Sequence, residues 1–379
     1  MTATLDPTDR LLAAVLWPGM GARPVTDGVA PAMLAARIRY HGIALLLCQD
    51  EQALAALPPV AQGAVRDEAR SQVFWEDSHR TMLAGLIDQL DRAGCPSLLL
   101  KGTALAYTVH ADPAARRRGD SDLLVRKADL ATARKVLRDG GFALSQDRQQ
   151  FQECWTISAG AGFAHTVDLH WQLTNVPALG RALDVEQAFA AAVPLPRLRA
   201  TALAIDPVRQ FLLGSINQRL HRVYGYYVDD SRVLGATRLI WALDNHLLAS
   251  RFDAGQWDQL ERMTLALGVP GLCLEALDLA QAVLGTSVPP AVAVSLRDAP
   301  RETWAERYFS APWTAACLRA DLAGCTSLGD RVRLLLGHAW PSAATLRDRH
   351  PELAAHSLAK AHLVRLAGLP RHMLAGFRG

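Results

Sequence analysis

Several features that would direct the interpretation of this chain of 379 residues are scarce or missing. The formal net charge is only +3, which argues against bulk, sequence-independent binding of nucleic acid. No apolar run reaches the roughly 18 residues that a membrane-spanning helix needs. The segment 1–9 carries acidic residues and no apolar core flanked by Lys or Arg, so it lacks the pattern of a secretory signal. We therefore expect neither a membrane partner nor a nucleic-acid partner.

Cysteine patterns and nucleotide-binding loops are missing too. The six cysteines include no C-x-x-C pair, and Cys317 and Cys325 are too far apart for a zinc knuckle. Buried thiols in a reducing compartment are the simplest interpretation, which predicts a cytoplasmic protein. The signature G-x-x-x-x-G-K-[ST] is absent, which excludes a Walker P-loop. No repeat of fixed period and no low-complexity segment is present.

What the sequence does contain is a short α+β segment between two helical regions. Apolar residues recur at three- and four-residue spacing up to Arg92, with the strongest helix predicted over 65–92. Short apolar runs then predict strands at 97–100, 120–125, 142–144, 151–157 and 165–173. Helical periodicity returns after 185. We therefore predict an N-terminal helical region over 1–95, an α+β core over 96–180 and a C-terminal helical domain over 181–379.

Two carboxylates mark the segment with the clearest chemistry. Asp120 and Asp122 stand one residue apart in a predicted strand, so they share a face. Adjacent carboxylates repel each other and need a cation or a shared proton. Asp168, in the apolar run Val167-Asp168-Leu169-His170-Trp171, supplies a third. A D-x-D pair alone is often a turn cap or a solvated pair, but the apolar run after it and the isolated Asp168 favour a divalent metal held by oxygen ligands.

The turn Lys101-Gly102-Thr103 follows the first predicted strand. A glycine that opens a helix after a strand lets backbone N–H groups approach phosphates, and an ordinary strand-to-helix turn is the alternative interpretation. Lys101 or Arg116 is suited to pair with a triphosphate. His170 shares the face of Asp168, either as a structural partner of a carboxylate or as a group that orients an acceptor.

These motifs together resemble the DNA polymerase β-like nucleotidyltransferase superfamily, which has G-[GS], then D-x-[DE] on the next strand, then a third acid. More closely, the chain resembles a bacterial family of uncharacterised nucleotidyltransferases often found near peptide or polysaccharide biosynthesis genes. The shared motifs are L-K-G, R-x-x-G-D-x-D-L-L-V and V-D-L-H-W, with helical motifs matched at Arg238–Asp244 and Pro341–His350. The chain departs at Thr103, where Gly or Ser is preferred, and at Asn217, where the family tends to carry a histidine.

The resemblance implies a small mixed-sheet, polymerase β-like core flanked by helical regions. It implies that Mg²⁺ or Mn²⁺ supports transfer of a nucleoside monophosphate, expected to be AMP from ATP or the corresponding group of another NTP. The acceptor would be a hydroxyl or phosphate of an unassigned small molecule or peptide. Asp120, Asp122 and Asp168 would hold the metal, with Asp168 as third ligand or as base. The nucleotide would be bound by Lys101, Gly102, Thr103, Arg116 and His170.

Two other functions stay open at this point. Besides the leading interpretation, the chain could be a catalytically silent nucleotide-binding scaffold of a biosynthetic complex, or a toxin-like transferase that acts on RNA or protein. Asp244 needs a partner in its apolar helix, and we expect a salt bridge with Arg238 or His221 rather than an acceptor contact. The loop Tyr224–Asp230 contacts an acceptor or is plain surface.

Overall fold

The computed structural model describes residues 5–19, 21–26, 28–148, 150–160, 162–228, 231–235, 237–300, 303–310, 315–341, 346 and 356–364. Its strands are β1 (Ser97–Leu100), β2 (Asp120–Val125), β3 (Ala143–Arg148), β4 (Gln152–Gly160), β5 (Phe163–His170), β6 (Val193–Pro194), β7 (Leu203–Ala204), β8 (Tyr226–Val228) and β9 (Ser231–Val233). The helices before and within the sheet region are α1 (Pro7–Leu16), α2 (Pro31–His41), α3 (Ala44–Cys48), α4 (Glu51–Ala55), α5 (Pro59–Arg92), α6 (Lys101–Thr108) and α7 (Leu130–Asp139). The later helices are α8 (Val185–Ala190), α9 (Pro207–Tyr224), α10 (Leu239–Ala249), α11 (Ala254–Leu267), α12 (Pro270–Leu284), α13 (Pro290–Asp298), α14 (Trp304–Ser310), α15 (Ala315–Gly324) and α16 (Leu328–Ala339).

A seven-stranded mixed sheet forms the centre of the molecule, in the order β3-β4-β5-β2-β1-β7-β6. The pairs β2·β5 and β1·β7 are parallel, and the other neighbours are antiparallel. A mixed sheet with helices before and after it in the chain confirms the predicted α+β class. The strands predicted at 97–100 and 120–125 have those bounds in the structure, whereas the two-residue strands β6 and β7 are too short for a sequence pattern and extend the sheet past residue 180.

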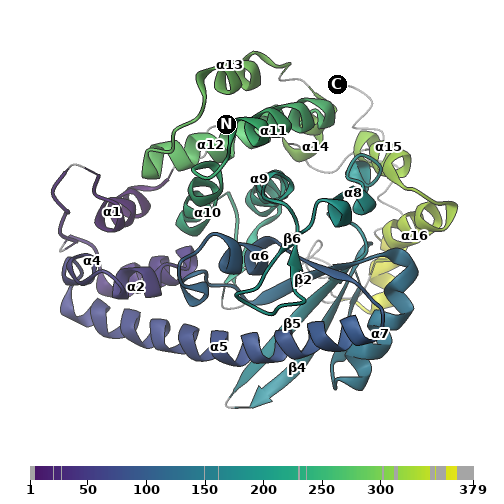
Figure 1. Ribbon diagram of the computed structural model, residues 1–379, viewed down its shortest axis with the longest axis horizontal. Coiled ribbons are helices and arrows are strands. Elements are labelled where there is room, and N and C mark those ends of the chain that lie inside the picture. Colours follow the sequence, from purple (N-terminus) through teal and green to yellow (C-terminus); the bar gives the residue numbers. More distant parts are fainter. Residues whose placement is uncertain are drawn as a thin grey trace.

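Side-chain alternation divides the sheet into two covered faces (Figure 1). Leu99, Leu123 and Val125 pack with apolar residues of α5 and α7 on one face. Leu98, Leu100 and Leu124 belong to a second core, which includes apolar residues of α9, α11 and α12. Burial on both faces explains why these strands appear in the sequence as nearly continuous apolar runs.

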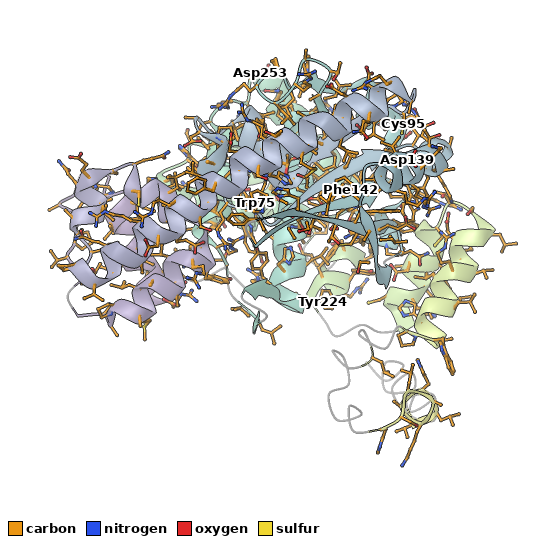
Figure 2. All side chains as sticks on the ribbon, turned by 90° about the horizontal axis from the view of Figure 1, so that it is seen from below. Trp75, Cys95, Asp139, Phe142, Tyr224 and Asp253 are labelled. Atoms are coloured by element: carbon orange, nitrogen blue, oxygen red, sulfur yellow. The ribbon has the colours of Figure 1, made fainter. Side chains whose placement is uncertain are left out.

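The longest helix, α5, lies across the first face (Figure 2). Its 34 residues span about 50 Å at 1.5 Å per residue. It begins at Pro59, earlier than the predicted start, because proline suits the first turn of a helix. It ends before Gly94, whose φ of 65° closes the turn. Ala61, Val65 and Ala69 of its first half pack with α1 to α4 in a third core.

No helix in the described part of the chain combines the length and apolarity needed to cross a bilayer. Of the predicted helical motifs, Arg238–Asp244 lies at the start of α10. Positions 342–345 and 347–350 of the Pro341–His350 motif lie outside the described residues, as do Asp229 and Asp230 of the predicted aromatic loop.

A buried polar network lies between α5 and the sheet, on the face opposite the two carboxylates. Ser121 Oγ is 2.7 Å from Thr103 Oγ1 and 2.7 Å from His79 Nε2. His79 Nδ1 in turn lies 3.2 Å from His165 Nδ1. The ring of Trp75 stacks on His79 with the centroids 4.2 Å apart. Burial, together with the charge of Arg118, holds the pKa of His79 well below its usual range, so the imidazole is neutral in the folded protein.

This network predicts that the free energy of unfolding falls as the pH drops below about 6.5. In that range His79 binds a proton in the unfolded chain but stays neutral in the folded protein. One such group contributes up to about 1.4 kcal/mol per pH unit below that point. In urea denaturation between pH 7.5 and 5.5, His79→Gln should therefore lose less stability than the wild type. His356→Gln, a change of an exposed side chain, is the control. Equal pH slopes for the wild type and His79→Gln would contradict this prediction.

Candidate active site

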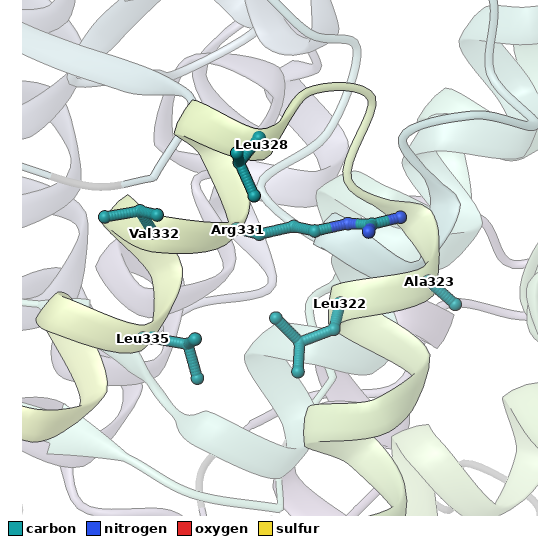
Figure 3. A pocket seen from close by; sticks show the side chains of 6 residues that line it. All are labelled: Leu322, Ala323, Leu328, Arg331, Val332 and Leu335. Atoms are coloured by element: carbon teal, nitrogen blue, oxygen red, sulfur yellow. The ribbon is translucent and has the colours of Figure 1, made fainter.

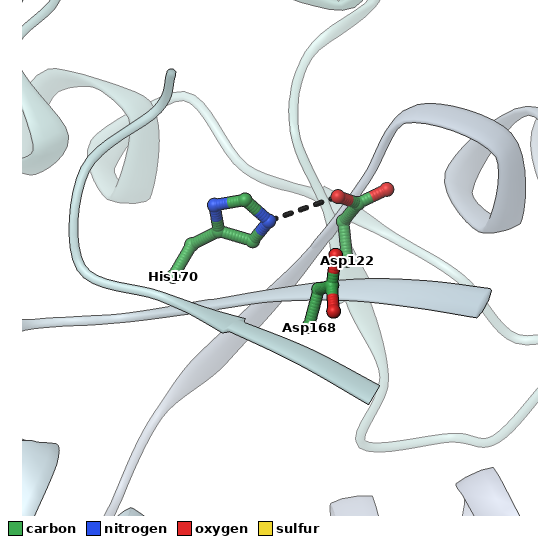
Figure 4. Close-up of side chains that lie close together, drawn as sticks. All are labelled: Asp122, Asp168 and His170. Carbon is green, nitrogen blue, oxygen red and sulfur yellow. Dashed lines mark hydrogen bonds and ion pairs between the residues drawn. The ribbon is translucent and has the colours of Figure 1, made fainter. Parts of the chain in front are cut away.

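Strand pairing brings the predicted acids together. β2 and β5 are parallel neighbours with Asp122 opposite Asp168, and the antiparallel partner of Asp122 on β1 is Leu100. The last residue of β1, Asp122 and Asp168 therefore form one row across three strands. Partners in register point to the same face, so the two carboxylates lie side by side, as Figure 4 shows together with His170.

Asp122, Asp168 and His170 each offer one ligand atom, and these atoms lie within 4.8 Å of one another. His170 is fully buried, and its Nε2 lies 2.8 Å from Asp122 Oδ1. Burial, followed by the charge of Lys101, lowers the pKa of His170, so the ring is neutral and its Nε2–H donates to the carboxylate. The prediction that Asp168 and His170 share a face is confirmed. The hydrogen bond from His170 also fixes the orientation of the Asp122 carboxylate.

Lys101 brings a cation to the same carboxylate. Its Nζ donates to Asp122 Oδ1 at 2.6 Å. Burial by itself would raise the pKa of Asp122, but the charge of Lys101 and the contact with His170 hold that pKa well below its usual range. Asp122 is therefore the carboxylate of the cluster that stays ionised.

The pKa values of Asp168 and Asp120 are shifted in the opposite direction. Burial, followed by the charges of Asp120 and Asp122, raises the pKa of Asp168 to about 7. Gln152 of β4 donates to Asp168 Oδ2 at 2.6 Å and itself accepts from Asn175. Asp120 retains solvent exposure at the end of β2, yet crowding by protein atoms and the charge of Asp122 raise its pKa to about 6. The two raised pKa values indicate that nearby cations do not fully neutralise the three carboxylates. A further cation would therefore be bound favourably.

The turn after β1 forms the second half of the site. A Cβ built on Gly102 would lie 3.7 Å from both terminal nitrogens of Arg116, so this guanidinium covers the start of α6. The Thr103 hydroxyl faces inward, where Arg118 Nε donates to it at 3.0 Å. The group of Thr103 that remains available to a phosphate is thus its backbone N–H in the first turn of α6.

Asp244 of α10 is buried, and its predicted partners were wrong. It accepts from Arg116 Nε at 2.8 Å and lies 2.8 Å from His110 Nε2, whereas we had expected Arg238 or His221. The sequence indicated that a buried Asp in an apolar helix needs a cation, but not which of the distant basic residues the fold brings to it. Asp244 thereby anchors the arginine that covers Gly102.

The aromatic residues near the predicted loop form a cluster around Arg238. The guanidinium lies 4.3 Å from the ring centroid of Tyr226, and the rings of His221 and Trp241 stack at 5.8 Å. The charges of Lys101 and Asp122 influence the pKa of His221, which burial lowers to about 4. The described part of the predicted loop therefore packs, through Tyr226, against Arg238 and Trp241.

A cavity of about 470 Å³ lies elsewhere, between α15 and α16 (Figure 3). It is lined by Leu322, Ala323, Leu328, Arg331, Val332 and Leu335. None of the clustered acids or glycine-turn residues lines this cavity. We therefore do not assign it to the candidate active site.

The comparison with protein families agrees with this geometry. The family model described as an uncharacterised nucleotidyltransferase matches residues 28–285, which include the whole seven-stranded sheet and the helices from α2 to α12. The chain belongs to this family and is an enzyme of the nucleotidyltransferase class. No curated protein and no solved structure matches it.

Removal of the Asp244 carboxylate should destabilise the fold. Asp244→Asn leaves the buried guanidinium of Arg116 without its counter-charge, and such losses cost about 3–5 kcal/mol. Denaturation in urea measures the change. Asp139→Asn, which removes one member of an exposed helical ion pair with Lys135, should change little. A fully stable Asp244→Asn protein with lost activity would instead assign this carboxylate to the acceptor.

Proposed function

We propose that the protein is a metal-dependent nucleotidyltransferase with a polymerase β-like core, which transfers AMP from ATP to a hydroxyl or phosphate of its acceptor. The observation that carries the proposal is the side-by-side placement of Asp122 and Asp168 next to the glycine turn at Gly102. Family membership supports the reaction class. The donor, the metal and the acceptor chemistry are our own inference.

The residues of the cluster fit a small divalent cation. Carboxylate oxygens are the ligands that Mg²⁺ and Mn²⁺ prefer, and Asp122 and Asp168 offer them within 4.8 Å of each other. The ammonium of Lys101 against Asp122 shows that the cluster attracts a positive charge. When bound, the metal would polarise the α-phosphate and help neutralise the triphosphate.

The protein residues then have separate tasks. Asp120, Asp122 and Asp168 would hold the ion. Asp122 is kept ionised by its surroundings and is oriented by His170. Backbone N–H groups at Gly102 and Thr103 would receive phosphate oxygens under the guanidinium of Arg116. Asp168, with a pKa of about 7, is suited to accept the proton of the attacking hydroxyl. The new acceptor–phosphorus bond forms as the bond to pyrophosphate breaks.

Loss of the carboxylates should separate binding from chemistry. We expect Asp122→Asn to weaken binding of Mg·ATP and to reduce pyrophosphate release at least about 100-fold, since metal polarisation contributes several kcal/mol. Asp168→Asn should retain more of the nucleotide affinity but lose the transfer step. Calorimetry with Mg²⁺ and a non-hydrolysable ATP analogue measures the first effect, and labelled ATP with a panel of candidate acceptors measures the second.

Asp139→Asn, on the exposed end of α7, is the matched control and should behave as the wild type. Equal Mg·ATP binding by the wild type and Asp122→Asn, with no pyrophosphate released with any acceptor, would overturn the proposed reaction. Binding without turnover, accompanied by a stable protein partner, would favour the scaffold function instead.

Metal binding should also depend on pH. The carboxyl groups of Asp168 and Asp120 hold protons below about 7 and about 6, and a cation must displace them. Mn²⁺ affinity in the presence of the ATP analogue should therefore rise between pH 5.5 and 7.5 and then level off. Asp168→Asn should lose the part of this rise near pH 7. A pH-independent affinity of the wild type would contradict the proposed ligands.

A further inference from the structure

Lys101 has an unusual backbone conformation. Its φ of 49° makes it the one non-glycine residue with positive φ in the described part of the chain. A side chain with a Cβ adopts the left-handed region only at a cost in conformational energy, so the surrounding structure must hold it there. Such positions are concentrated where a side chain has to be aimed in a particular direction.

Gln210 of α9 supplies that hold. Its Oε1 accepts from the backbone N–H of Lys101 at 2.9 Å, and its Nε2 donates to the backbone carbonyl of the same residue at 3.2 Å. Gln210 is 2% exposed, so both bonds form away from competing water. One side-chain amide thus contacts both polar groups of the strained residue, from a helix more than 100 positions later in the chain.

The conformation aims the Lys101 ammonium into the carboxylate cluster. Its Nζ lies 2.6 Å from Asp122 Oδ1, and its charge also acts on Asp120 and Asp168. The ammonium therefore neutralises the carboxylates that would ligate a metal ion. An ammonium and a divalent cation cannot both bind closely to Asp122 without strong mutual repulsion.

We infer that Gln210 and Lys101 form a positioning unit that makes metal and nucleotide binding interdependent. Gln210 holds Lys101 so that its ammonium is the resident cation of the cluster, and the ammonium leaves Asp122 only when a triphosphate offers it another anionic partner. The metal ion then takes its place beside Asp122. This inference rests on the proposed nucleotidyl transfer, and it adds a residue of the helical region, Gln210, to the machinery of the site.

The coupling follows from the charges. Without nucleotide, a metal ion must compete with the Lys101 ammonium for Asp122, so the metal affinity is reduced. With nucleotide, the negative triphosphate would pair with the ammonium, and the Asp122 carboxylate would become free to hold a metal ion. Each ligand therefore strengthens the binding of the other by the same factor. An enzyme built in this way discriminates against free metal in favour of the metal–nucleotide complex.

The test is a titration of the full-length protein with Mn²⁺, followed by electron paramagnetic resonance, with and without a non-hydrolysable ATP analogue. Lys101→Met removes the competing charge and should tighten Mn²⁺ binding without nucleotide about tenfold, which corresponds to about 1.4 kcal/mol. The analogue should then improve the affinity of this variant less than that of the wild type. Gln210→Leu should shift both quantities in the same direction by a smaller factor, about threefold.

Matched controls separate this effect from general destabilisation. Gln218→Leu removes a glutamine of the same helix that exchanges two hydrogen bonds with Asn245. Lys127→Met removes a lysine paired with Asp330. Both controls should leave the Mn²⁺ affinities at wild-type values. Lys101→Gly, which accepts a φ of 49° without strain, replaces Lys101→Met if the latter does not fold.

Two negative results have different meanings. If the wild type binds Mn²⁺ together with the analogue, but neither Lys101 variant gains affinity in its absence, the positioning unit is wrong and the transferase function stands. If Gln210→Leu changes only the melting temperature, Gln210 is merely structural and its part of the inference is wrong. If the wild type binds no Mn²⁺ even with the analogue, the proposed metal-dependent function fails as well.

Discussion

The parallel pairing of β2 with β5 is the constraint on which the site depends. It sets Asp122 beside Asp168 in a sheet whose two faces are largely covered by apolar cores. Two carboxylates in such surroundings raise each other's pKa and are costly to ionise together. The surrounding groups compensate in part: Lys101 and His170 stabilise the charge on Asp122, and Gln152 donates to Asp168. The remaining negative charge is the basis of the proposal that the site binds a metal ion and, through it, a nucleotide.

The helices after the sheet do more than cover it. Gln210 of α9 bonds to the backbone of Lys101, and Asp244 of α10 holds Arg116 over Gly102. Each contact ties a helix to one of the two cationic residues that face the proposed phosphate site. Helices of the C-terminal half therefore support the candidate site, and the family match likewise continues to residue 285, past the last strand of the large sheet.

Much of the site was predictable from short segments. A period of two places Asp120 and Asp122 on one face, and the apolar run around Asp168 indicated another buried strand with an acid. The partners of these residues were not predictable in the same way. Gln152 and Gln210 are ordinary glutamines in the sequence, and nothing in their local segments indicates that they bond to Asp168 and Lys101. The expected partners of Asp244 were wrong for the same reason. The sequence alone does not show which of several basic residues the fold brings to this carboxylate.

The sequence by itself determined which residues the proposed chemistry uses, because strand alternation, a glycine turn and isolated acids in apolar runs are local properties. Only the tertiary structure decided how those residues are coupled. The register of β2 against β5, the left-handed backbone of Lys101 and the pairing of Asp244 with Arg116 depend on segments far apart in the chain. Their geometry is set by packing against those segments, which no local pattern encodes. The two carboxylates of β2 could thus be recognised from the sequence, but the ammonium that pairs with Asp122 became visible only in the folded protein.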